Sequence, residues 1–181
     1  MIAALIYLVD TLLSLCLLAV LLRLLLQWSR ADFRAPLVRS LVQITNPVVL
    51  PLRRVLPAIG RLDTASAVAV LVFAAADAAA PSMLSGVGLP LPVPWVWLTL
   101  AEIARMVLRT YLFTVFLYVL LSFLTPGGYS PANAVLAPLA ESVLRPVRRL
   151  IPPIAGLDLS PLWVLIAIQA ALIALTGLTG I

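Results

Sequence analysis

Charged side chains inside apolar stretches are the residues of this sequence whose type and position could do chemistry. Asp10 lies in a long apolar run near the N-terminus, and Glu102, Arg105 and Arg109 open another such run. A charge within a membrane is costly unless it meets an opposite charge, so these residues mark ion pairs or ion pathways. We expect Asp10 to pair with Arg105 or Arg109. Alternatively, Glu102 neutralises Arg105 within one helix, where residues three apart are neighbours.

Asp77, near the end of the apolar run at about 64–80, extends this set of charges. It could simply face headgroup water, or it could line an outward-facing polar vestibule together with Asp10, Arg105 and Arg109. The residue spacing leaves both arrangements open, and it equally allows a structural ion pair with no role in transport.

The residue types that most enzymes need are missing from the sequence. There is no histidine, which is the commonest general base and metal ligand, and the single cysteine, Cys16, lies inside an apolar run. No glycine-rich phosphate loop occurs, and no serine or cysteine stands beside a recognisable base. We therefore predict that the protein is not an enzyme and has no catalytic, cofactor-binding or metal site.

Four apolar runs are long enough to hold these charges inside a bilayer, which takes roughly 20 residues. The chain is 64% hydrophobic and 10% charged, whereas soluble domains are about 25% charged. The mean hydropathy of +1.17 also indicates a membrane protein. Membrane-spanning helices are predicted at about 2–27, 64–80, 104–124 and 160–179.

The spans fall into two copies of one unit, offset by 95 residues, which is the separation of Arg53 and Arg148. At this offset Pro36 matches Pro131 and Asp63 matches Asp158. Duplication of this kind is typical of pseudo-symmetric membrane proteins. The predicted fold is all-α, with two helical-hairpin repeats at 1–80 and 104–181 and a Pro- and Gly-rich connection at 81–103.

The linker inside each repeat is rich in arginine, whereas the connection at 81–103 has no basic residue. Cytoplasmic loops of membrane proteins carry the excess of positive charge. Both linkers, 29–63 and 125–159, are therefore expected in the cytoplasm, with both termini and the connection in the periplasm. The two repeats then share one orientation and are parallel.

Apolar residues recur at helical spacing within both linkers. Each set predicts a short amphipathic helix that lies at the cytoplasmic surface of the membrane. We expect Asn46-Pro47 to end the first helix, and the prolines that follow to make an extended return path. The apolar residues are Phe33, Leu37, Leu41, Ile44 and Val48 in the first linker and Ala132, Leu136, Leu139 and Val143 in the second.

Five arginines near the predicted membrane surface are candidate contacts for anionic lipids or for a partner protein. Juxtamembrane arginines attract anionic headgroups. Arg23 lies inside the first span but only roughly 7–8 Å along the helix from Trp28, so its side chain is expected to extend to the surface. Direct nucleic-acid binding is not expected so close to the bilayer. The five are Arg23, Arg53, Arg54, Arg148 and Arg149.

Three polar residues stand at the start of the returning spans. Asp63 and Asp158 could each accept backbone N–H bonds and cap the helix that follows. Pairing with the preceding arginines is the alternative. Ser160 followed by Pro161 is typical of an N-cap and a first helical residue.

The sequence resembles the YggT family of small membrane proteins, also called the YlmG family. The second copy holds the most specific segment, which begins at Arg148-Arg149 and ends at Asp158-Leu-Ser160-Pro161, similar to the family's arginine–proline–glycine segment. The two copies differ in one respect that matters here. The first copy has Arg23, and the second has Tyr118 at the equivalent position.

This resemblance implies a multi-pass protein of the bacterial inner membrane that is linked to osmotic stress and ion homeostasis. A scaffold or accessory role is the first expectation. A small oligomeric ion channel, or an assembly factor for division or respiratory complexes, is the alternative. The expected partners are the lipid bilayer, anionic lipids, and membrane proteins or further copies of the chain.

Overall fold

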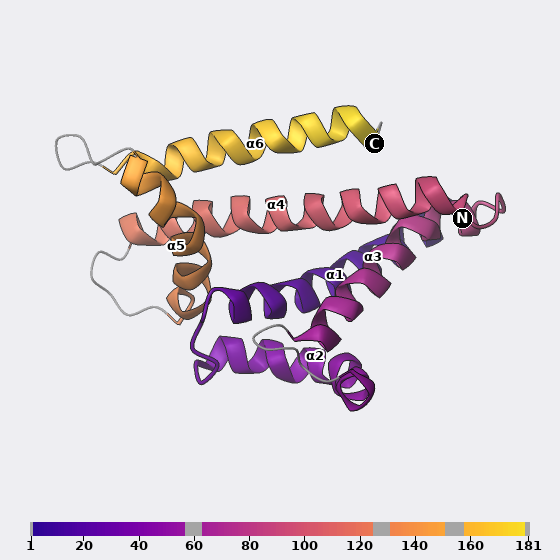
Figure 1. Ribbon diagram of the computed structural model, residues 1–181, viewed down its shortest axis with the longest axis horizontal. Helices are drawn as coiled ribbons and strands as arrows, with labels where there is room; N and C mark the ends of the chain where they lie inside the picture. The colour runs from indigo at the N-terminus through magenta and orange to yellow at the C-terminus, as the bar shows by residue number, and fades with distance from the viewer. Residues whose placement is uncertain (1, 57–62, 125–130, 151–157, 180–181) are drawn as a thin grey trace. The chain divides into compact units, whose positions relative to one another are not determined.

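The computed structural model describes residues 2–56, 63–124, 131–150 and 158–179, and these residues form helices joined by short turns. No strand occurs among them, which confirms the predicted all-α class. The helices are α1 (Ile2–Trp28), α2 (Pro36–Val55), α3 (Thr64–Leu84), α4 (Pro92–Leu124), α5 (Asn133–Leu150) and α6 (Ser160–Thr179) (Figure 1).

Four of these helices are long and apolar enough to cross a membrane, so the protein is a membrane protein. They are the counterparts of the four predicted spans. At 33 residues α4 is about 50 Å long, so it extends well beyond a hydrocarbon core of about 30 Å. The candidate spans are Ala3–Trp28, Thr64–Leu84, Pro92–Leu124 and Ser160–Leu178.

The connection between the repeats is shorter than 81–103. α3 continues to Leu84, and α4 begins at Pro92 rather than at 104. Prolines in the first turn of a helix cost no hydrogen bond, because the N–H groups there have no intrahelical acceptor. Gly86 and Gly88 make the turn between the helices at positive φ, which glycine adopts without steric penalty.

The expectation that Asn46-Pro47 ends the first amphipathic helix is wrong, because α2 passes through Pro47 and Pro51. A proline inside a helix costs about 3 kcal/mol. Both prolines lie on the exposed side of α2, whereas Val49 beyond Pro47 is fully buried and offsets much of that cost. The return paths predicted to be extended fall on 57–62 and 151–157, outside the described residues.

The buried face of α2 differs from the predicted apolar stripe. Val38, Thr45 and Val49 are buried, whereas Leu37 and Ile44 of the predicted stripe are exposed. Hydrophobic spacing locates an apolar surface but does not tell which part of it packs on protein and which part meets lipid. In α5 the buried residues are Leu139, Ala140 and Leu144.

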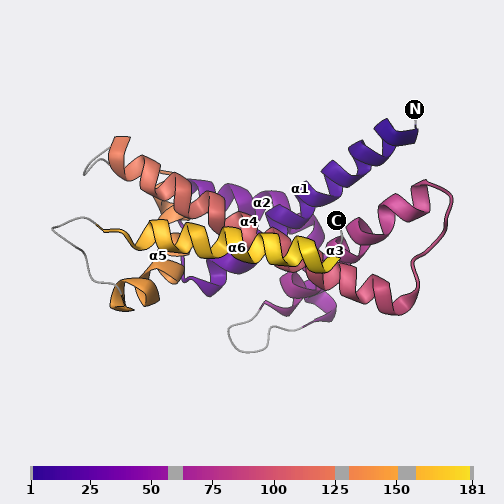
Figure 2. The ribbon, with the colours of Figure 1, turned by 90° about the horizontal axis from the view of Figure 1, so that it is seen from above.

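The helices pack into two compact units that do not coincide with the sequence repeats. Unit 1 comprises Met1–Leu24 and Ile44–Met106, and unit 2 comprises Leu25–Gln43 and Val107–Ile181. Within unit 2, α6 lies alongside the second half of α4, and α5 crosses near one end of both (Figures 1 and 2). Their shared core consists of Val115, Ala140, Leu144, Val164 and Ile168.

Candidate functional site

An arginine–aspartate pair joins the end of α2 to the beginning of α3. Arg53 donates from Nε to Asp63 Oδ1 at 3.2 Å and from Nη2 to Oδ2 at 2.5 Å. Ser66 donates to the same carboxylate at 2.7 Å, and the Asp63 side chain is only 2% exposed. Two parallel bonds between guanidinium and carboxylate make a strong and directional contact. The pair therefore holds α2 against the foot of the returning span.

Arg23 of α1 is buried beside this pair, at 3% exposure. Its Nη1 donates to Thr45 Oγ1 at 2.8 Å and to Asn46 Oδ1 at 3.0 Å, and its Nε lies 4.0 Å from Asp63 Oδ2. Arg23 therefore does not extend to the membrane surface as expected. The reason is that α2 and Asp63 supply acceptors that replace water around the guanidinium.

Unit 2 contains a matching group of polar side chains. Arg148 of α5 donates from Nε to Asp158 Oδ2 at 2.7 Å and from Nη1 to Glu141 Oε1 at 2.7 Å. Tyr118 of α4 donates to Glu141 Oε1 at 3.3 Å, and Arg145 donates to Glu141 Oε2 at 3.3 Å. This group joins α4, α5 and the start of α6.

The two groups are copies of one arrangement at the 95-residue offset, and we call them the first and second polar clusters. At the four corresponding positions the first has two arginines and one carboxylate, whereas the second has one arginine and two carboxylates. Arg145, which also binds Glu141, has no counterpart in the first, where Leu50 stands at that offset. Two equivalent arginine sites are therefore not present. Arg23, Asn46, Arg53 and Asp63 of the first cluster correspond to Tyr118, Glu141, Arg148 and Asp158 of the second.

Asp63 and Asp158 behave differently as helix caps. Asp63 occupies the N-cap position of α3, but its side chain accepts no backbone N–H there, so the pairing with arginine is what the structure shows. Asp158 accepts the N–H of Ser160 at 2.9 Å in addition to its bond with Arg148. Ser160 does not cap α6 as predicted, since it is already the first helical residue. Its buried hydroxyl has no partner among the described residues.

The surroundings keep the cluster carboxylates ionised. Burial alone would raise the pKa of Asp63, but the hydrogen bonds from Arg53 and Ser66 hold it below the usual value. Burial acts on Glu141 in the same direction, and there Arg148 holds the pKa low. The hydrogen bond to Asp63 in turn raises the pKa of Arg53. At neutral pH the Arg53–Asp63 and Arg148–Glu141 pairs are therefore charged on both sides.

The charges predicted to meet inside the membrane lie together in unit 1, with one exception. Arg105 donates to Glu102 at 2.8 Å, which is the local pair given above as the alternative. Asp77 is buried at 6% exposure, rather than facing water, and Ser14 donates to it at 3.3 Å. Asp10, Glu102 and Arg105 interact electrostatically with the Asp77 carboxylate. Arg109 belongs to unit 2, where its side chain is exposed.

Of the five arginines proposed to contact lipids or partners, two are exposed and lie outside the polar clusters. Arg54 and Arg149 are exposed and make no ion pair with any residue that the structure describes. Arg53 and Arg148 are held in the clusters, and Arg23 is buried. Within the same described ranges, no group of three or more acidic, Cys or His side chains could hold a metal ion.

Glu141 and Asn46 are the cluster members that the sequence analysis missed. One signal for Glu141 was present, because it lies seven residues before Arg148 and thus on the same helix face. Asn46 could then have been identified as the residue at the equivalent position of the first copy, 95 residues earlier. Neither residue is visible from hydropathy alone.

Comparisons with known proteins find relatives that match most of the chain. An uncharacterized protein of Pseudomonas aeruginosa is 36% identical over 167 residues, which cover 92% of this chain and 85% of that protein. The uncharacterized protein YggT of Escherichia coli K12 is 33% identical, covering 86% of this chain and 80% of its own. A Vibrio alginolyticus protein, described as lying in the proC 3′ region, is 32% identical, covering 91% and 89%. No solved structure matches significantly.

The family model that matches is described as CCB3/YggT, and it matches twice, at residues 2–84 and 97–179. The two matches contain the first and the second polar cluster respectively, so the duplicated arrangement lies in the part of the chain that the family shares. The chain belongs to the CCB3/YggT family.

Proposed function

We propose that this protein is a non-catalytic scaffold or accessory protein of the bacterial inner membrane that supports ion homeostasis and the envelope under osmotic stress. One observation carries the proposal. In each repeat, an arginine near the end of the amphipathic helix binds the aspartate ten residues later, at the foot of the returning span. Such pairs fix a surface at the membrane boundary without providing a reactive group.

The proposal includes a topology in which α2 and α5 lie at the cytoplasmic surface and both termini are periplasmic. Arginines in the last turns of α2 and α5 favour this orientation. Arg54 and Arg149 are then the contacts for anionic lipid or for a partner membrane protein. Exposed Leu37 and Ile44 on α2 suit a helix that is partly immersed in the headgroup layer.

A growth experiment tests the scaffold role. In a bacterial strain that lacks its own family member, the wild-type chain should restore growth at high osmolarity. The double variant Arg54→Gln/Arg149→Gln should fail to restore it at equal membrane abundance, whereas Arg39→Gln, another exposed arginine, should restore it. Full restoration by the double variant would contradict the role given to these arginines.

The second candidate function is a small oligomeric ion channel, and the buried group around Asp77 favours it. Four spans leave little room for a pore in one copy, so several copies would be needed. Purified protein in liposomes should show no ion flux above protein-free liposomes if the scaffold proposal is right. Flux that Asp77→Asn abolishes would instead support the channel. Division or respiratory subunits recovered with the protein would support the third alternative, an assembly factor.

A further inference from the structure

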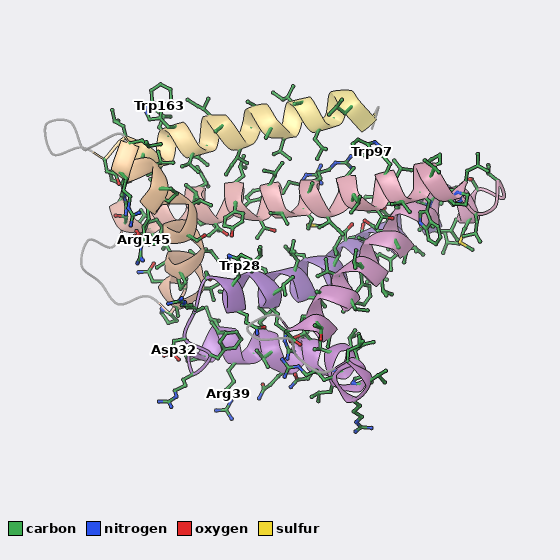
Figure 3. The ribbon with its side chains drawn as sticks, viewed as in Figure 1. Trp28, Asp32, Arg39, Trp97, Arg145 and Trp163 are labelled. Carbon is green, nitrogen blue, oxygen red and sulfur yellow. The ribbon has the colours of Figure 1, made fainter. Side chains whose placement is uncertain are left out.

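An open cavity of about 620 Å³, with both polar and apolar side chains in its lining, lies within unit 2 between the turn that follows α1 and one face of α5. Trp28 at the end of α1 and Arg30 and Asp32 in the turn line it on one side, and Glu141 and Arg145 line it from α5. Figure 3 labels Trp28, Asp32 and Arg145. Its volume is within the range of small-molecule sites. None of the sequence predictions placed a binding site here.

Side chains of both charges line the cavity and keep hydrogen-bonding groups that no described residue occupies. The Arg30 side chain is exposed and makes no ion pair in the described part of the chain. Arg145 is 73% exposed and uses Nε for Glu141, so its remaining donors are available. Asp32 is exposed, and one of its oxygens accepts the Arg34 N–H at 2.9 Å. Glu141, by contrast, is already bound by Arg148.

The backbone at Arg30 is one that does not require an arginine. Arg30 has a φ of 57°, the left-handed conformation in which a helix often ends and which glycine adopts most easily. A residue with a Cβ at such a position costs about 1 kcal/mol. This conformation closes α1, since the Ala31 N–H donates to the Leu26 carbonyl at 3.0 Å, and glycine could serve there equally well.

The end of α1 sets the depth of the cavity in the membrane. Trp28 is the last residue of a candidate span and is 72% exposed. Tryptophan concentrates at the level of the lipid headgroups. The residues that follow it, Arg30 and Asp32, therefore lie where headgroups lie.

We infer that this cavity binds the headgroup of a zwitterionic, amine-bearing phospholipid of the phosphoethanolamine type. The phosphate fits against Arg30 and Arg145, and the ammonium donates to Asp32. An anionic headgroup without an amine leaves Asp32 beside a like charge. A choline headgroup has no N–H to donate. This inference does not depend on the scaffold role.

Native mass spectrometry of the full-length protein, taken from membranes that contain equal phosphatidylethanolamine, phosphatidylglycerol and phosphatidylcholine, tests it. The wild-type chain should retain phosphatidylethanolamine in preference to both others. Arg30→Gly should reduce that retention by about tenfold, equivalent to the loss of one charged contact. Because glycine relieves the backbone strain, the melting temperature should stay unchanged or rise, which separates loss of the site from loss of the fold.

Two further variants complete the test. Asp32→Asn should remove the preference for phosphatidylethanolamine over phosphatidylcholine, since only the amine contact is weakened. Arg39→Gln, an exposed arginine on α2 that does not line the cavity (Figure 3), should behave as the wild type. Equal retention of phosphatidylglycerol by the wild type, or undiminished phosphatidylethanolamine in Arg30→Gly, would overturn the inference.

Discussion

At the scale of single residues, the aspartates at equivalent positions of the two polar clusters differ in their surroundings. The Asp63 side chain is 2% exposed and lies against Arg23 and Arg53, whereas the Asp158 side chain is 32% exposed. Arg148, the partner of Asp158, also binds Glu141. Removing one member of a buried ion pair leaves an uncompensated charge, while an exposed pair contributes little.

We therefore expect Asp63→Asn to lower the free energy of unfolding by about 3–5 kcal/mol, because two arginines then lack their carboxylate. Asp158→Asn should cost about 1 kcal/mol or less, since Arg148 keeps Glu141. Unfolding in mixed micelles, followed by circular dichroism, measures both changes. An equal loss for the two variants would show that burial does not distinguish the clusters.

At the scale of elements, α2 is the helix whose sequence and structure disagree most. Pro47 lies inside it on the exposed side and leaves the Gln43 carbonyl without its usual donor. Burial on both sides of Pro47, at Thr45 and Val49, holds the helix together across the interruption. Tertiary packing has overridden local propensity here.

Pro47→Ala should accordingly stabilise the protein, by about 1–3 kcal/mol, because alanine restores the missing N–H and has the best helix propensity. The gain is smaller than the full propensity difference, since proline also restricts the unfolded chain. Thermal unfolding measures it. A drop in stability would mean that the bend at Pro47 is needed to place Val49 and the Arg53–Asp63 pair.

At the scale of the whole molecule, neither compact unit is made from one repeat alone. Unit 1 takes Pro92–Met106 from α4, beyond the turn that joins the repeats, and unit 2 takes Leu25–Gln43 from the first repeat. Inside unit 1, Trp95 of α4 donates from its indole N–H to the Ala75 carbonyl of α3 at 2.9 Å. Each repeat thus lacks part of its packing when it stands alone.

A chain divided in the turn at 85–91 tests this dependence. Either half expressed alone should be degraded or recovered at low yield, whereas the co-expressed halves should co-purify and unfold cooperatively. The half-chain yields relative to the intact protein give the measurement. Halves that are stable separately would show that each repeat folds independently.

Much of this protein was predictable from the sequence, because the relevant signals are local. Apolar runs of sufficient length indicated the four spans, and the 95-residue offset indicated the duplication. The alternative pairing of Asp63 and Asp158 with the preceding arginines was also within reach, since these residues recur together in both copies.

Only the tertiary structure decided which of these residues are buried by other parts of the protein. Arg23 is buried because Thr45, Asn46 and Asp63 meet it from other elements, and α2 continues past Pro47 because residues beyond it are buried. The cavity at Arg30 likewise depends on α5 facing the turn after α1. Hydropathy and spacing describe one segment at a time, whereas burial and pairing depend on which segments meet.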